Sequence, residues 1–265
     1  MKDFLKILED FSPIFKDYIP GIAAAIAAVL AILTYQRAKE TFLQPVRTEV
    51  IKKQTDLLIH VLELVDSDLK IMESYDASKL VEVNLLAAML ECGTIFNDMD
   101  KVEKFVKENT FSHVVSKEAM ERDFEVVQTF NSEKKPASKE TPNKRGKRNY
   151  DLAKKGNFKV EIFHITKAYV DFLKALENLI SNPFMPSSVQ LLLKELVREI
   201  EENTHTHLSN AVSKAVNDSF VHHNGEMPSV SGVYNSFNHE RLEHGSVTDS
   251  LRSEIRKYLK IDSMP

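Results

Sequence analysis

Residues 18–36 read YIPGIAAAIAAVLAILTYQ, a run of 19 residues without a formal charge. A helix needs about 20 residues to cross the hydrocarbon core of a bilayer, so this run predicts a single transmembrane helix. Its many alanines contribute little to insertion, which makes the predicted span a marginal one. Two alternatives are a buried helix of a soluble protein and a cleaved signal peptide, but the acidic residues within 1–17 are unlike a short basic leader.

Basic residues on the two sides of this run predict its orientation. Residues 1–17 contain three lysines, whereas residues 37–53 contain five lysines and arginines. Basic residues favour the cytoplasmic side, so we expect a single-pass protein of the cell membrane with its C-terminal part in the cytoplasm. Cys92 is the only cysteine, and a chain without disulfides fits the same compartment. We predict that Cys92 is a small core residue.

Residues 1–17 and the alanines of the run add two expectations about the membrane. Large apolar residues mark one side of the first segment: Phe4, Leu5, Leu8, Phe11 and Phe15. Such an amphipathic helix can lie along the bilayer surface. Within the run, Ala23, Ala27 and Ala31 recur every four residues, a spacing that lets two membrane helices approach closely. We therefore expect a homo-oligomer in the lipid bilayer, unless alanine is simply frequent there.

The rest of the chain is predicted to be all-α, a helical bundle formed by regions 37–130 and 158–265. Seven glycines give little material for tight turns, and Leu, Lys, Glu and Ala dominate. Pro45 is predicted to end or kink the membrane helix, and a long helix should follow from Val46 to Ser74. Its apolar residues repeat every seven positions in two adjacent columns, the second being Ile51, Leu58, Val65 and Met72, which favours packing in a bundle.

The later part of the chain is predicted to contain several helices joined by loops. We predict a helix over 117–130, a helix from Phe158 to Ile180, another from Ser187 that could reach Val221, a long loop over 224–245 and a final helix from Ser246. Any strands should be short ones near 111–115 or 158–163.

Residues 131–157 differ in composition from the rest. They contain nine lysines and arginines against three acidic residues, a net charge of +6. We predict a disordered basic linker, with contact to anionic lipid headgroups or nucleic acid as the functional alternative. Interleaved aromatic residues are missing except for Tyr150, so stacking on single-stranded bases is not supported.

No sequence motif assigns a chemical reaction to this chain. It contains no GxGxxG, GxxxxGK[ST] or HExxH motif, so no cofactor and no metal are predicted. Arg198 and His205 lie seven residues apart, on the same face of a helix. Their segment, REIEENTH, resembles the loose Arg-polar-x(4–6)-His motif of HEPN-type ribonucleases, which are all-α proteins that often pair two protomers. The resemblance implies that Arg198 binds phosphate and His205 assists proton transfer.

The residues around this pair favour a simpler interpretation. Glu199, Glu201 and Glu202 add negative charge, which repels RNA. Both residues also point away from the apolar stripe of their helix, so we expect exposed surface side chains, and His207 on the stripe should be a core histidine.

The sequence therefore predicts a membrane-anchored, non-catalytic interaction, scaffold or sensor protein with a possible protein partner. In general character it resembles small bacterial membrane proteins, some of which act in stress responses or phage defence. The alternatives are a membrane-anchored HEPN-like ribonuclease that uses Arg198 and His205, and an effector whose membrane helix oligomerises and perturbs the bilayer.

Overall fold

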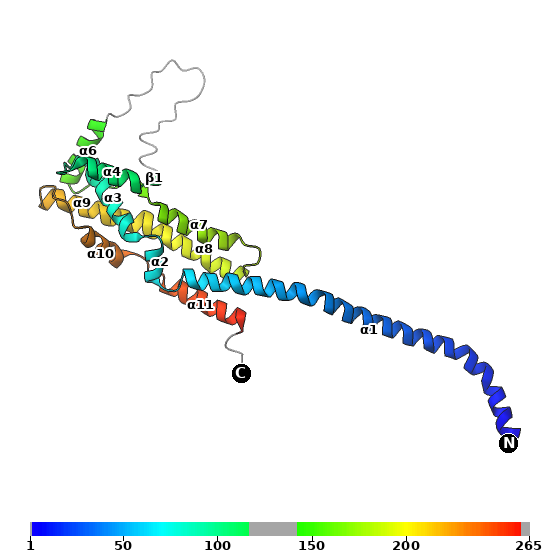
Figure 1. Cartoon of the computed structure of the whole chain (residues 1–265). Coiled ribbons are helices and arrows are strands. Elements are labelled where there is room, and N and C mark those ends of the chain that lie inside the picture. Colours follow the sequence, from blue (N-terminus) through cyan, green and yellow to red (C-terminus); the bar gives the residue numbers. More distant parts are fainter. Residues whose placement is uncertain (1, 117–141, 261–265) are drawn as a thin grey trace, which may run out of the picture. The chain divides into compact units, whose positions relative to one another are not determined.

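The computed structural model describes residues 2–116 and 142–260 (Figure 1), with side chains described for these residues except 2–20, 22, 40–43 and 142–144. Helix dominates this part of the chain, so the prediction of an all-α fold class is confirmed. The chain divides into two compact units, Met1–Asp56 and Leu57–Pro265. The helix that we predicted over 117–130 lies outside the described residues.

Helix α1 (Lys2–Leu64) continues through Pro45, so the helix does not end there, which was one of the two predicted outcomes. A proline inside a helix removes one backbone hydrogen bond, and the helix continues for several turns on both sides of that loss. The break comes later, at Ser67, whose hydroxyl accepts a hydrogen bond from the Lys70 N–H at 3.2 Å. Ser67 thereby caps a new helix, α2 (Asp68–Ser74), so the single helix predicted here is two helices.

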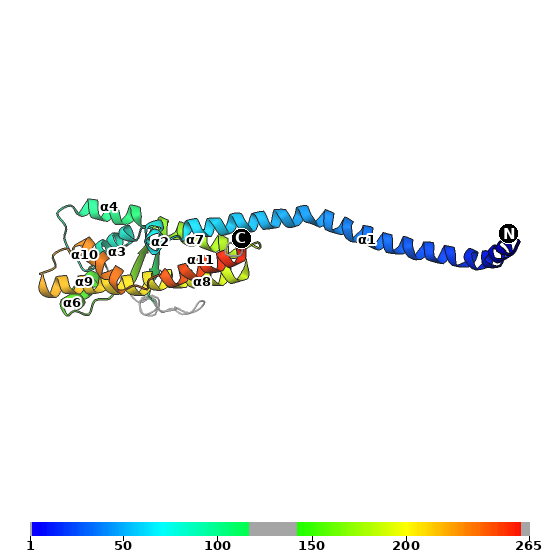
Figure 2. The same cartoon turned by 90° about the horizontal axis from the view of Figure 1, so that it is seen from below.

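The core of the second unit lies between antiparallel and crossing helices. Figures 1 and 2 both place α7 (Lys167–Ser181) beside α8 (Ser187–Glu202), and α8 beside α11 (Gly245–Leu259). On the other side of the core, α3 (Ala77–Glu91) packs on α9 (Ser209–His222). Helices pack in this way because each buries one apolar stripe against its neighbours.

The exposure of the side chains shows which part of the predicted apolar columns belongs to this core. Leu58 and Val65 are buried, whereas Ile51 of the same column is 61% exposed. The column therefore belongs to the core from Leu58 onward, past the end of α1 and into α2, where Met72 is also buried. Cys92 is buried, as predicted, and burial raises the pKa of its thiol to about 12. Helix α4 (Met99–Asn109) packs on α3 through Val106.

The described residues contain one two-stranded antiparallel sheet, β1 (Ser112–Val115) and β2 (Ile162–Ile165). Strands were predicted near these places, with the second one a few residues earlier. The helix predicted from Phe158 begins only at the start of α7, because Thr166 accepts a hydrogen bond from the Tyr169 N–H and caps it.

Two predicted irregular segments are helical. The loop predicted over 224–245 contains α10 (Val230–Glu240), which buries Val233 and Phe237 one turn apart. The second half of the predicted basic linker forms α6 (Pro142–Lys154), while its first part, 131–141, lies outside the described residues. The predicted helix from Ser187 to Val221 is confirmed, but a π-helical segment, η1 (Asn203–Leu208), joins α8 to α9.

Candidate functional site

The segment of α1 from Ala23 to Leu33 exposes every one of its side chains. Its large apolar residues are about half exposed: Ile26 55%, Val29 56%, Leu30 57%, Ile32 57% and Leu33 49%. At 100° per residue these five cover roughly 160° of the helix, and the alanines cover most of the remainder. The segment is therefore apolar around its whole circumference, a pattern typical of a helix that something else covers.

Among the residues whose side chains the structure describes, no helix is both long enough and apolar enough to cross a membrane. Part of the predicted span was not included in that comparison, because the structure does not describe the side chains of residues 18–20 and 22. The same holds for the predicted interfacial segment, residues 1–17.

Arg198 and His205 are both exposed, as predicted. Arg198 lies on α8, where Nη2 is 2.7 Å from Oε1 of Glu195 and Nη1 is 2.9 Å from Oε2 of Glu202. Its guanidinium is thus already held between two carboxylates of its own helix. A phosphate would have to compete with both of them.

His205 lies in η1, where backbone hydrogen bonds span five residues instead of four. The wider turn shifts it relative to Arg198, so a spacing of seven residues no longer places the two on one line. Its ring lies edge-on to Phe163, with 5.8 Å between the centroids, and the partial loss of water around the ring lowers its pKa. His207 is half-buried instead of lying in the core. The catalytic roles of Arg198 and His205 stay a prediction.

The basic segment is folded where it is described, because two of its arginines meet acidic partners. Arg145 Nη2 lies 3.7 Å from Glu91 Oε1 and 3.9 Å from Glu161 Oε2, and Arg148 Nη2 lies 3.2 Å from the same Glu161 oxygen. Burial raises the pKa of Glu91 to about 7, against the opposing effect of Arg145. These contacts attach α6 to the end of α3, so this half is not the disordered linker that we predicted.

A buried polar cluster joins three segments that are far apart in the sequence. We call it the His244 junction; its members are Asp68 of α2, Glu199 of α8, Asn203 of η1, and Arg241 and His244 between α10 and α11. Arg241 donates through Nη1 to Asp68 Oδ1 at 2.8 Å and through Nη2 to the other carboxylate oxygen. The His244 backbone N–H donates to Asp68 Oδ1 at 3.0 Å. The bidentate pair of Arg241 and Asp68 fixes the geometry of the two side chains as well as balancing their charges.

The hydrogen-bond partners of His244 identify which of its ring nitrogens carries a proton. Its side chain is fully buried, with Nδ1 3.0 Å from Glu199 Oε2 and Nε2 3.3 Å from Asn203 Nδ2. Asn203 accepts from the Leu242 N–H through Oδ1 at 2.7 Å, which identifies its other atom as the amide nitrogen. An amide nitrogen only donates, so Nε2 accepts and Nδ1 carries the proton toward Glu199. Both ring nitrogens are thus engaged within the junction.

Asp68 is ionised in this junction. Burial favours its neutral form, but the hydrogen bonds from Arg241 and from the His244 backbone outweigh that effect and lower its pKa. The junction is a set of mutually satisfied polar groups that joins α2 to α8 and to the start of α11. Sequence reasoning missed it because Asp68 and Arg241 are 173 residues apart and no local motif connects them.

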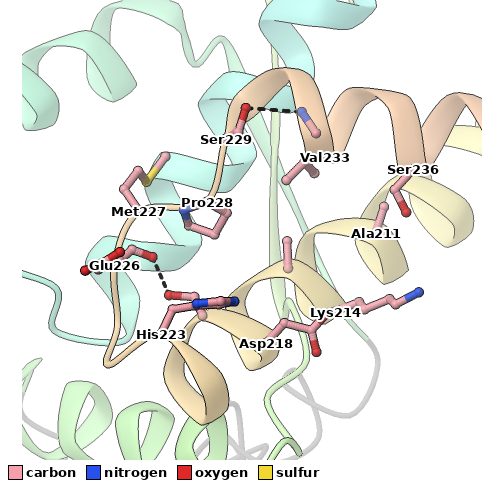
Figure 3. Close-up of a pocket in the computed structure, with 13 residues that line it drawn as sticks. Ala211, Lys214, Asp218, His223, Glu226, Met227, Pro228, Ser229, Val233 and Ser236 are labelled. Carbon is pink, nitrogen blue, oxygen red and sulfur yellow. Dashed lines mark hydrogen bonds between the residues drawn. The ribbon is translucent and has the colours of Figure 1, made fainter.

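An open pocket of about 400 Å³ lies beside α9 and α10 (Figure 3). Its apolar wall includes Met227, Pro228 and Val233, and its polar rim includes Lys214 and Asp218. The loop that closes one end is held by Ser219, whose hydroxyl donates to the Glu226 carbonyl. An apolar wall with a polar rim suits a small ligand or a partner side chain.

The sheet brings together two histidines, which could suggest a metal site. His113 and His164 are register partners, and their ring centroids lie 4.6 Å apart. Burial, with a smaller effect of His113, lowers the pKa of His164 to about 4, and its Nδ1 lies 3.1 Å from the Thr110 hydroxyl. Two nitrogens are fewer than a zinc site needs. Within the described ranges, no group of three or more His, Cys, Asp or Glu residues could hold a metal ion.

Comparison with known proteins adds no relative: no protein-family model, no curated protein and no solved structure matches this chain.

Proposed function

We propose that this chain is a membrane-anchored, non-catalytic interaction protein, with residues 18–36 as its anchor and Leu57–Pro265 as its cytoplasmic unit. The observation that carries the proposal is the apolar surface of α1 between Ala23 and Leu33, which is exposed on every side. A surface of this kind is costly in water, at roughly 25 cal/mol for each Å² of apolar area. Lipid covers such a helix without requiring a partner of matching shape.

The cytoplasmic unit supports an interaction role through its surface. Its polar groups at the His244 junction are engaged with one another, whereas the pocket beside α9 and α10 is open to solvent. Met227 is 37% exposed at this pocket and would bury an apolar surface on contact with a partner. We therefore place the partner or ligand of the protein at this pocket.

Topology provides the direct test of the anchor. A reporter fused after Pro265 should be active in a cytoplasmic assay and inactive in a periplasmic one, because the basic excess on the C-terminal side of 18–36 favours the cytoplasm. The same reporters placed before residue 1 should give the opposite pattern. Periplasmic activity after Pro265 would reverse the orientation, and cytoplasmic activity at both ends would remove the span.

Self-association through the alanine face is a second expected property. In lipid no hydrophobic force draws two spans together, so close backbone packing between small residues must supply the attraction. Replacing Ala27 by leucine should hold the backbones apart and lower the dimer fraction in a two-hybrid assay of the span. Ala25→Leu is the matched control, because two residues along a helix is 200° and places Ala25 on the opposite side. An equal effect of both changes would show that the alanine face is incidental.

A further inference from the structure

A basic groove lies between α9 and the connection from α6 to β2. The groove has a volume of about 650 Å³, and three lysines line it: Lys155, Lys159 and Lys214. One carboxylate, Asp218, and one exposed histidine, His222, complete its charged lining. The balance of formal charge is therefore positive even with His222 neutral.

The connection that carries two of these lysines is held in place by α9. Asn217 accepts from the Phe158 N–H through Oδ1 at 2.9 Å and donates through Nδ2 to the Phe158 carbonyl at 3.0 Å. The Ser213 hydroxyl accepts from the Val160 N–H at 3.0 Å. Phe158 itself is buried. These three bonds hold the backbone between Lys155 and Lys159 against the helix, which reduces the ordering cost of binding between them.

The lysines are available to a ligand. Within the described part of the chain, neither Lys155 nor Lys159 forms an ion pair. Lys214 has only a long contact, 3.9 Å from Nζ to Oε1 of Glu240, and its side chain is 64% exposed. This differs from Arg145 and Arg148, which lie close to the partly buried Glu91 and Glu161.

We propose that this groove binds a small molecule through a terminal phosphate group, which Lys155, Lys159 and Lys214 surround. Lysine ammonium groups act as point charges that suit phosphate oxygens. The volume lies within the range of roughly 300–1,000 Å³ that is usual for small-molecule sites. The one phenylalanine, tyrosine or tryptophan of the lining, Phe158, is buried, so the groove presents no large aromatic face on which nucleic acid bases could stack. The groove shares Lys214 and Asp218 with the pocket beside α9 and α10, but a phosphate ligand goes beyond the proposed function and does not depend on the membrane anchor.

Titration of the full chain in nonionic detergent with inorganic tripolyphosphate tests the groove. We expect saturable binding of one molecule per chain by calorimetry. Lys155→Glu combined with Lys159→Glu should weaken it about a hundredfold, because each change removes a charge-assisted hydrogen bond worth roughly tenfold or more. The matched control, Lys174→Glu with Lys194→Glu, makes the same change in net charge on exposed positions of α7 and α8 and should leave binding within about twofold.

Asp218→Asn provides a second variant that misfolding cannot imitate. Removing the one carboxylate of the groove should tighten tripolyphosphate binding, because it removes a like-charge repulsion. A loss of affinity in this variant, equal losses in the groove pair and the control pair, or no saturable binding by the native chain would each overturn the proposal.

The phosphate could belong to a soluble molecule or to a lipid headgroup, and a competition experiment separates the two. Short-chain phosphatidic acid added to the titration should displace tripolyphosphate if the groove receives a headgroup. Unchanged binding at a lipid excess would assign the groove to a soluble phosphate compound. Either result supports the terminal phosphate as the recognised group.

Discussion

Replacing Ile26 by arginine should move most of the protein from the membrane fraction to the soluble fraction. Ile26 lies near the middle of residues 18–36 and is 55% exposed. Arginine at the centre of a membrane helix costs about 2.5–3.5 kcal/mol, which is roughly a hundredfold change in an insertion equilibrium. A span rich in alanine has little insertion free energy in reserve, so one charge should be enough.

Ile95→Arg is the matched control for this prediction. Ile95 is the same residue type, 87% exposed, and lies outside the α1 helix. Fractionation after alkaline carbonate extraction should leave the Ile95→Arg protein in the membrane pellet with the native chain. If Ile26→Arg also stays in the pellet, another segment anchors the protein. If the native chain itself is soluble and oligomeric, other copies of the chain cover the apolar surface of α1.

Local signals in the sequence predicted the starts of α8 and α11 but missed those of α6, α7 and α10. A serine or threonine before an apolar stripe marks such a start, and helices do begin at the predicted Ser187 and within a residue of Ser246. No side chain caps α8, and Gln190 Nε2 instead donates to the Ile180 carbonyl of the preceding helix at 2.9 Å. A contact of this kind needs the preceding helix in place, so a local motif does not reveal it.

The two segments that we predicted as irregular fold for reasons that lie elsewhere in the chain. Helix α10 contains polar and β-branched residues of modest helix propensity, yet Val233 and Phe237 find a core to enter. Helix α6 is strongly charged, and Glu91 and Glu161, which are outside the helix, match its arginines. In both segments tertiary contacts override composition.

The candidate sites divide in the same way. The apolar surface of α1 can be read from consecutive residues, because a helix without charge needs no distant partner to be recognised. The basic groove combines Lys155 and Lys159 with Lys214 of α9, and the His244 junction combines three separate segments. Only the fold brings these residues together, so spacing along the chain contains no trace of either site.

Arg241→Met should cause the largest loss of stability among single changes in the His244 junction, about 3 kcal/mol. The Arg241 side chain is 5% exposed, and its removal leaves the partly buried Asp68 carboxylate without its cation. Breaking a buried pair from one side costs about 3–5 kcal/mol, and the partial exposure of Asp68 places the expectation at the lower end. Urea unfolding of the full chain in nonionic detergent, followed by far-ultraviolet circular dichroism, measures the change.

Arg198→Met is the control that separates burial from geometry. Arg198 also lies within 3 Å of two carboxylate oxygens, at 2.7 and 2.9 Å, but its side chain is 58% exposed. Water replaces those contacts, so we expect little change in stability. Adding Asp68→Asn to Arg241→Met should recover part of the loss, because the uncompensated charge is then gone.

Because the pKa of Asp68 is lowered in the folded state, the stability that Asp68 contributes is present above the ordinary aspartate pKa of about 3.9 and is lost as the pH falls below it. The difference between the native chain and Arg241→Met should therefore shrink in acid, and equal losses for the two arginine variants at neutral pH would contradict the role of the junction.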